Sequence, residues 1–177
     1  RDEQEPFVLG KRDIRGVVSN GMLASPKELG LYESHEGILE ISVDEVGQEL
    51  ATPGTEFRKL YGLDDLLIDI ENKMFTHRPD CFGQIGIARE LAGIQGMQYQ
   101  SPDWYTKSPS ENLASEGPHI SCKNEAPEKV SRFMAQVVSG ITVKQSPVWM
   151  QAYLTRVGIR PINNIVDWSN YYMHLTA

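Results

Sequence analysis

The chain has 177 residues, of which 40% are hydrophobic and 23% are charged, and its net charge at neutral pH is -7. This composition is typical of a soluble globular protein with one large domain or two small ones. No apolar run approaches the roughly 20 residues that cross a bilayer, and no basic stretch before an apolar one predicts a secretory signal. Cys81 and Cys122 are too few for a disulfide framework, so we expect reduced thiols in a cytosolic protein.

The charge is unevenly distributed along the chain. Residues 1–80 hold nine Lys and Arg against seventeen Asp and Glu, whereas residues 81–177 hold eight against seven. Because phosphate binding needs clustered Lys and Arg, the acidic half is a poor non-specific surface for nucleic acid. The local group Lys11, Arg12 and Arg15 is the candidate phosphate contact, and the alternative interpretation is a solvated surface.

The first 50 residues predict small β elements. Residues 7–18 alternate loosely, which favours strands joined by a turn at Gly10-Lys11-Arg12. Ser25-Pro26-Lys27-Glu28 is a capping box, which predicts one helical turn that ends at Gly30. A further strand is expected at 38–41. Together these elements resemble the closing part of a small β-barrel.

Residues 51–100 predict a small helical module that begins after the turn Thr52-Pro53-Gly54-Thr55. A short helix is expected at 57–60, stopped by Gly62, and a short buried strand at 66–70. A rigid Arg78-Pro79-Asp80 turn then opens a helix that runs to about Ile94, with Asp80 as its N-cap.

Four charged side chains in this helical module form a candidate cluster: Arg78, Asp80, Arg89 and Glu90. One interpretation is a charged surface that faces RNA or another subunit. The favoured interpretation is structural, with Arg78 and Asp80 shaping the turn while Arg89 and Glu90 bond neighbouring segments. Carboxylates in the cluster would also repel phosphate.

Residues 101–118 have a linker composition, rich in Ser, Pro, Asn and Gly. The remainder predicts strands at 120–122, 132–138 and 141–143. A helix is expected to start with a Ser146 cap and to run to about Val157, before Gly158. A second helix at 162–175 follows from apolar residues that step by three or four positions.

A dense polar group lies at the start of this second helix: Asn163, Asn164, Asp167, Ser169 and Asn170. Such side chains need hydrogen-bond partners where they are buried. The local interpretation is a capped helix start, with Asn163 or Asn164 as the cap and Asp167 near the positive end of the helix dipole. The nearby aromatics Trp149, Tyr153, Trp168, Tyr171 and Tyr172 favour core packing over base stacking because of their helical spacing.

Several kinds of chemistry have no support in the sequence. The four histidines are scattered and none has metal-ligand spacing, so we predict no metal site. There is no phosphate-binding glycine loop and no Gly-x-Ser-x-Gly nucleophile motif. The chain by itself is therefore not expected to be a complete enzyme.

Three colinear motifs resemble the beta subunit of bacterial phenylalanyl-tRNA synthetase, and the resemblance covers about residues 7–100 and 120–175. The first motif is Ile14-Arg15-Gly16-Val17-Val18-Ser19-Asn20-Gly21-Met22-Leu23-Ala24-Ser25, followed by Glu28-Leu29-Gly30-Leu31. The second is Thr76-His77-Arg78-Pro79-Asp80-Cys81, followed by Ile85-Gly86-Ile87-Ala88-Arg89-Glu90-Leu91. The third comprises Ser146-Pro147-Val148-Trp149-Met150-Gln151, Gly158-Ile159-Arg160-Pro161-Ile162-Asn163-Asn164-Ile165-Val166-Asp167 and Asn170-Tyr171. Two departures are His77, where Asn is commonest, and Ser169, where Thr is usual.

This resemblance implies an α+β, multidomain architecture. Residues 1–50 would be the C-terminal part of a tRNA-binding OB-like domain, and residues 51–100 a small helical module of winged-helix or DNA-binding-like type. A linker at 101–118 would lead to residues 119–177, the N-terminal part of a mixed α/β editing-type domain. The start at Arg1 instead of Met, together with the missing barrel strands, favours a fragment of a longer protein.

The resemblance also implies a function: part of the beta chain of phenylalanine–tRNA ligase, which attaches phenylalanine to its tRNA with ATP and Mg²⁺. The implied partners are the alpha subunit, in a two-alpha, two-beta heterotetramer, and tRNA(Phe), without a membrane or DNA. The aminoacylation site lies in the family's alpha chain, so no catalytic residue, metal site or cofactor is expected in this fragment. The fragment is expected to be cytoplasmic and inactive alone.

Within the family, the residue matching Ser169 lies in an editing pocket that hydrolyses tyrosine mistakenly attached to the tRNA. The resemblance therefore makes Ser169 and Asn170 the candidate editing residues, and Lys11, Arg12 and Arg15 the candidate tRNA contacts. The histidine-containing segment that follows in the family is not in this sequence, so the pocket here is expected to be incomplete. Two alternatives stay open: a stand-alone tRNA-binding OB module and a free-standing editing domain.

Overall fold

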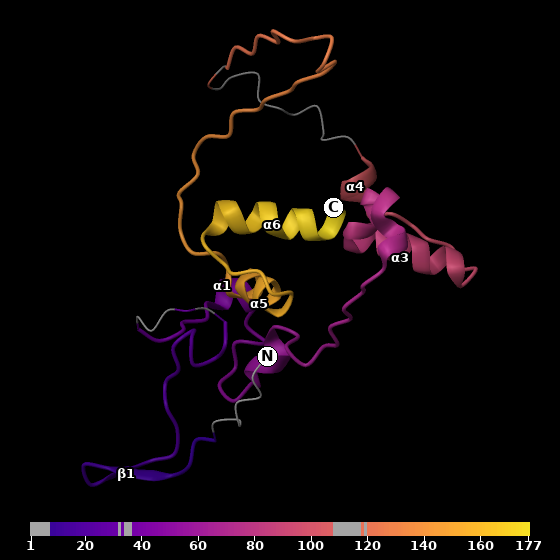
Figure 1. Cartoon of the computed structure of the whole chain (residues 1–177). Coiled ribbons are helices and arrows are strands. Elements are labelled where there is room, and N and C mark those ends of the chain that lie inside the picture. Colours follow the sequence, from indigo (N-terminus) through magenta and orange to yellow (C-terminus); the bar gives the residue numbers. More distant parts are fainter. Residues whose placement is uncertain (1–7, 32, 34–36, 108–117, 119) are drawn as a thin grey trace. The chain divides into compact units, whose positions relative to one another are not determined.

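The computed structural model describes residues 8–31, 33, 37–107, 118 and 120–177, and within them the chain is a mainly helical α+β fold (Figure 1). This confirms the predicted α+β class. Its strands are β1 (Arg12–Ile14) and β2 (Val17–Ser19). The helical elements are α1 (Val43–Val46), α2 (Phe57–Leu60), η1 (Lys73–His77), η2 (Pro79–Phe82), α3 (Gln84–Ile94), α4 (Asp103–Thr106), α5 (Val148–Arg156) and α6 (Asn164–Thr176), where η denotes a 3-10 helix.

The chain divides into two compact units. The first unit comprises Arg1–Glu71 and Gln145–Tyr171, and the second comprises Asn72–Lys144 and Tyr172–Ala177. Most of the segment expected to be a linker, residues 108–117, lies outside the described residues.

β1 and β2 form an antiparallel hairpin in which Arg12 pairs with Ser19 and Ile14 pairs with Val17. The two residues between the strands, Arg15 and Gly16, have φ angles of 54° and 81°. Positive φ at both positions is what a two-residue hairpin turn requires. The predicted turn at Gly10-Lys11-Arg12 is therefore wrong, because Gly16 supplies the left-handed conformation and Arg12 already belongs to β1.

The capping box at Ser25 is confirmed. The backbone N–H of Ser25 donates to the Glu28 carboxylate at 2.7 Å, and the N–H of Glu28 donates to Ser25 Oγ at 3.4 Å. The Ser25 hydroxyl adds a third bond to the same carboxylate at 2.8 Å. The resulting hydrogen-bonded turn ends at Gly30, whose φ is 69°, and leads into the buried Leu31.

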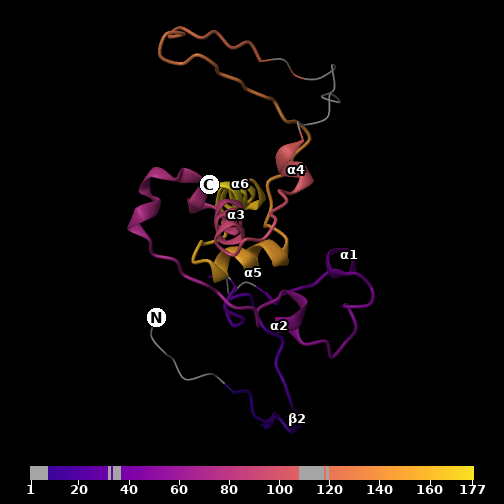
Figure 2. The ribbon, with the colours of Figure 1, turned by 90° about the vertical axis from the view of Figure 1, so that its right-hand side faces the viewer.

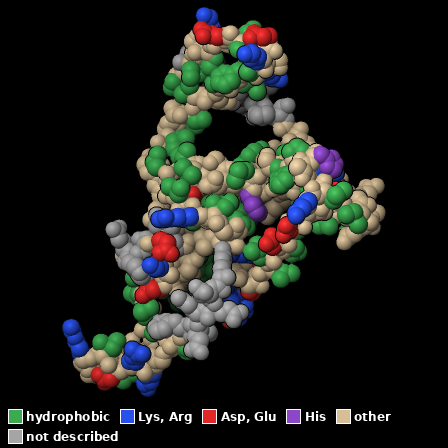
Figure 3. Space-filling view, viewed as in Figure 1, with side chains coloured by type: hydrophobic (Ala, Val, Ile, Leu, Met, Phe, Trp, Pro, Cys, Tyr) green, Lys and Arg blue, Asp and Glu red, His purple; other side chains and the backbone are tan. Residues whose placement is uncertain are grey.

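The other predicted strands are wrong: none of the segments 38–41, 66–70, 120–122, 132–138 and 141–143 forms a strand. Residues 120–147 run without helix or strand through Figures 1 and 2. A strand needs a neighbour for its N–H and C=O groups, and β-favouring side chains alone do not supply one. Apolar side chains of these segments are instead exposed, including Leu66 at 78%, Phe133 at 65% and Met134 at 72%. In Figure 3, hydrophobic side chains are exposed on the segment at the top of the view, which belongs to residues 120–147.

Helix α5 carries the core of the first unit. Met150 and Leu154, one helical turn apart, are fully buried. Val148 and Ala152 form a buried cluster with Leu31, and the partly buried side chains packed against it are Leu29, Leu39, Phe57, Tyr61 and Leu63.

The two ends of α5 test the predicted cap and stop. The helix ends as predicted before Gly158, with φ of 81° there and a bond from the Ile159 N–H to the Leu154 carbonyl at 2.8 Å. It begins after Pro147, so the predicted Ser146 cap is wrong.

Helix α3 of the second unit ends at Ile94 as predicted, just before Gly96, whose φ is 65°, but it starts at Gln84, later than predicted. Its N-cap is Gly83, so the predicted Asp80 cap is wrong. Asp80 lies instead in the first turn of η2, where Arg78 holds its carboxylate. η2 and α3 pack so closely that a Cβ atom placed on Gly86 would overlap the backbone carbonyl of Asp80.

Candidate functional site

The candidate editing residues lie in the first half of α6. Asn163 caps this helix, because its side-chain oxygen accepts from the N–H groups of Ile165 at 3.0 Å and Val166 at 3.1 Å. This confirms the predicted cap. Ser169 is exposed, and its hydroxyl donates to the Val166 carbonyl at 2.7 Å. Asn170 is half-buried beside it. The structure thus presents a hydroxyl and an amide on adjacent positions of one capped helix.

Asp167 lies in the first turn of α6, near the positive end of the helix as predicted, and its side chain is fully buried. Its Oδ2 accepts from the Ser146 hydroxyl at 2.5 Å, and its Oδ1 accepts from the Ile162 N–H at 2.8 Å. Both carboxylate oxygens are therefore satisfied, as a buried charge requires. Sequence reasoning missed Ser146 as the partner, since nothing local to either residue marks a bond across 21 positions.

Aromatic rings connect α5 with the exposed side of α6. Trp149 meets Trp168 edge-on, with ring centroids 6.1 Å apart, and meets Tyr171 at 5.4 Å. Tyr153 also contacts Tyr171, at 4.9 Å. These contacts confirm packing for four of the five predicted rings, although Trp168 stays 51% exposed. The fifth ring, Tyr172, contacts Trp104 with ring centroids 5.7 Å apart and is 50% exposed.

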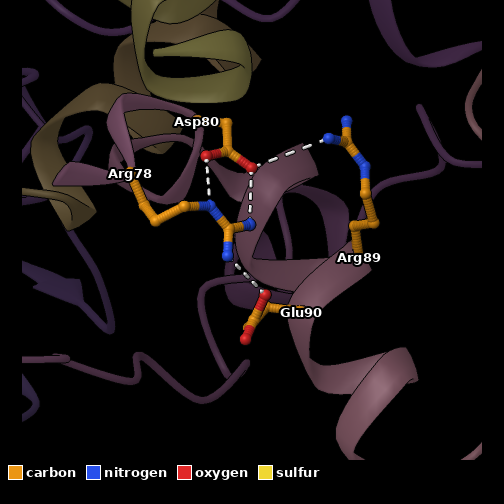
Figure 4. Close-up of polar contacts among 4 residues, drawn as sticks. All are labelled: Arg78, Asp80, Arg89 and Glu90. Atoms are coloured by element: carbon orange, nitrogen blue, oxygen red, sulfur yellow. Dashed lines mark hydrogen bonds and ion pairs between the residues drawn. The ribbon is translucent and has the colours of Figure 1, made fainter. Parts of the chain in front are cut away.

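The four charged residues of the second motif form one network in the second unit, drawn in Figure 4. Arg78 bonds both oxygens of Asp80 at 2.9 Å and bonds Glu90 at 3.1 Å. Arg89 lies 3.6 Å from the Asp80 carboxylate. The hydrogen bonds with Arg78 hold the pKa of Asp80 below its ordinary value, and the same bonds raise the pKa of Arg78. The network joins η2 to α3 and has no net charge, which suits a structural role.

The candidate phosphate contacts lie on the hairpin. Lys11 precedes β1, Arg12 belongs to β1 and Arg15 forms the turn, and all three are exposed. The intervening Asp13 accepts a bond from the Gly16 N–H at 2.8 Å. The three cations therefore lie within five sequence positions, at the start and at the turn of the hairpin.

Within the described ranges, no group of three His, Cys, Asp or Glu side chains is placed to hold a metal ion. Among the same residues, no helix has both the length and the apolar character needed to span a membrane.

Comparison with known proteins gives a family match and close relatives. The B3/4 domain family matches residues 129–177, the segment that carries α5, α6 and the candidate editing residues. The chain is 40% identical over 166 residues to the phenylalanine–tRNA ligase beta subunit of Solibacter usitatus, covering 93% of this chain and 20% of that protein. It is 36% identical over 167 residues to the same subunit of Desulfotalea psychrophila, covering 94% of this chain and 19% of that protein. It is 38% identical over 162 residues to the same subunit of Thermotoga maritima, covering 92% of this chain and 19% of that protein.

The chain therefore spans about a fifth of the length of these relatives. Similarity at this level, extended along more than nine tenths of the chain, confirms the resemblance carried by the three motifs. Over nearly its whole length, the chain is similar to the corresponding part of phenylalanine–tRNA ligase beta subunits.

Proposed function

We propose that this chain works as part of the beta chain of a phenylalanine–tRNA ligase, which attaches phenylalanine to tRNA(Phe) with ATP and Mg²⁺. The observation that carries this proposal is its similarity to three such beta subunits over at least 92% of its length. In this role the chain supplies scaffold and tRNA contacts. The aminoacylation site, ATP and Mg²⁺ belong elsewhere in the enzyme, and the chain alone is inactive.

The proposed organisation has three parts, and the 101–118 linker joins the second part to the third. Residues 1–50 contribute to an OB-like tRNA-binding domain, residues 51–100 form a winged-helix-like module, and residues 119–177 begin the editing domain. The exposed cations of the hairpin, Lys11, Arg12 and Arg15, support a contact with tRNA phosphates. The B3/4 match at residues 129–177 supports the third part.

The proposed editing role belongs to Ser169 and Asn170. An aminoacylation site that accepts phenylalanine discriminates imperfectly against tyrosine, and a separate hydrolytic site restores the discrimination. The Ser169 hydroxyl donates its proton to the Val166 carbonyl, so its oxygen can accept a bond from a water or from the mischarged tRNA terminus. The working enzyme would be a cytoplasmic two-alpha, two-beta heterotetramer.

The test is to express the full-length product of the gene that encodes this chain with the alpha subunit from the same genome. We expect a stable complex that charges tRNA(Phe) with phenylalanine and deacylates tyrosyl-tRNA(Phe). A complex that charges phenylalanine but leaves tyrosyl-tRNA intact would refute the editing role alone. A product that binds tRNA without associating with an alpha subunit or charging would refute the ligase assignment and favour a stand-alone tRNA-binding module.

The contribution of Ser169 is tested by Ser169→Ala in that complex. We expect slower deacylation of tyrosyl-tRNA(Phe), because the hydroxyl is lost while the capped helix remains. Unchanged deacylation would remove Ser169 from the proposed pocket.

A further inference from the structure

We infer that Asp167 is a positioning residue for the editing pocket: by holding Ser146 and Ile162, it sets the rotation of α6 and so the direction of the Ser169 hydroxyl. This inference rests on the proposed editing function. It assigns to Asp167 a role that is exerted through another residue, without contact to the tRNA.

The buried Asp167 carboxylate accepts hydrogen bonds from two donors. The Ser146 hydroxyl lies just before α5, and the Ile162 N–H lies in the connection between α5 and α6. Ser146 is held a second time, because the Gln151 side-chain amide donates to its carbonyl at 2.6 Å. Asp167 therefore bonds to Ser146, which directly precedes the Pro147 cap of α5, and to Ile162, which lies just before α6; we call this pair of bonds the Asp167 clamp.

Helix α5, which begins two residues after Ser146, is itself held in place by other contacts. The Trp149 N–H at the start of α5 donates to Glu45 Oε1 at 3.0 Å, and the Thr155 hydroxyl donates to the Leu31 carbonyl at 2.6 Å. Met150 and Leu154 fill the core between them. Because Ser146 lies just before this fixed helix, its bond to Asp167 restrains α6 as well.

Helix geometry converts this bond into a direction for Ser169. Successive residues turn by about 100°, so Ser169 lies roughly 200° around α6 from Asp167, on the opposite and exposed face. Asn170 lies roughly 60° from Asp167 and is half-buried. Rotation of α6 that moved Ser169 would pull the carboxylate off its donors and leave a buried charge unsatisfied.

The aromatic contacts between α5 and α6 do not replace the clamp. Edge-to-face ring pairs tolerate a range of offsets, whereas a carboxylate with two short bonds from different segments is directional. The rings hold the two helices together, and Asp167 sets the rotation.

The experiment uses the full-length protein in complex with its alpha subunit and measures kcat and KM for deacylation of tyrosyl-tRNA(Phe). Ser146→Ala removes one donor from the clamp. We expect kcat to fall roughly tenfold to a hundredfold, as misplacement of a reacting group does, with KM for the tRNA unchanged. The matched control is Ser25→Ala, since Ser25 and Ser146 are both 5% exposed and Ser25 belongs to the capping box. Ser25→Ala is expected to lower the melting temperature without changing kcat.

A double-mutant cycle separates positioning from general stability. If Ser146 and Asp167 act through Ser169, adding Ser146→Ala or Asp167→Asn to Ser169→Ala causes no further loss of kcat. Where Asp167→Asn does not fold, the Ser146→Ala and Ser169→Ala pair completes the cycle. Losses that add independently, or normal kcat in Ser146→Ala, would overturn the clamp while leaving Ser169 in place. Normal deacylation in Ser169→Ala itself would overturn the proposed pocket and the inference together.

Discussion

Replacing Gly86 by alanine perturbs the contact between η2 and α3 with a single methyl group. A Cβ at this position would meet the backbone carbonyl of Asp80. No side-chain rotation can relieve such a contact, so one of the two helices must shift. Gly93, seven residues later in the same helix, has nothing within 4 Å of its would-be Cβ and is the matched control.

The two substitutions are expected to change the free energy of unfolding in opposite directions. In a helix interior alanine is favoured over glycine by about 0.5–1 kcal/mol, so Gly93→Ala should stabilise the protein by about that amount. Gly86→Ala gains the same propensity but adds overpacking, which costs about 1–3 kcal/mol. Because the obstacle is backbone, we expect the upper part of that range and a net loss of roughly 2 kcal/mol.

Thermal unfolding followed by circular dichroism measures the difference. For a chain of this size each kcal/mol moves the melting temperature by about 2–4 °C, so the two variants should differ by roughly 5–12 °C. The Arg78–Glu90 bond, which spans η2 and α3, should weaken as the helices separate. If Gly86→Ala melted as high as Gly93→Ala, the close packing of η2 on α3 would be refuted.

Three more substitutions test the first unit. Leu154→Ala should cost about 2–5 kcal/mol in urea unfolding, because the side chain is fully buried; an effect no larger than that of Leu91→Ala, whose side chain is 48% exposed, would contradict the core. Ser25→Ala should cost about 1 kcal/mol in the same assay by removing the capping box, and an unchanged midpoint would argue against it. The Tyr61 hydroxyl is buried without a hydrogen-bond partner among the described residues, and burial raises its pKa to about 12. Since the folded state favours the neutral phenol, this stabilisation is intact below pH 10, the ordinary pKa, and is lost as the pH rises towards 12. Tyr61→Phe should remove that alkaline loss, whereas an absorbance titration showing every tyrosine ionising near pH 10 would exclude the shift.

Features set by neighbouring residues were predictable from the sequence. The helix at 57–60, the stop at Gly158 and the cap at Asn163 each follow from residues within a few positions, and the structure contains all three. Strands were not predictable in the same way, since their stability depends on a partner that local alternation does not specify. The exposed Leu66 and Phe133 carry β-favouring sequence without any described partner strand beside them.

In the candidate site, too, local features were predictable and contacts between distant residues were not. The motif around Arg78 and Asp80 predicted a local turn, and the bond between these residues is local. The clamp was not predictable, because Asp167 at a helix start usually suggests a dipole contact. Its partner, Ser146, has the sequence context of a helix cap, and the two residues meet only once α5 and α6 fold back on each other.

The edge-on rings between α5 and α6 give the protein an optical reporter of its own. Trp149 and Trp168 lie on different helices with centroids 6.1 Å apart, and Tyr171 contacts both. At such distances the indole and phenol transitions couple, and excitation passes from tyrosine to tryptophan. Near-ultraviolet ellipticity and tyrosine-excited tryptophan emission should therefore register a small rotation of α6. Movement of the helix that carries Ser169 can be followed in solution without an attached label.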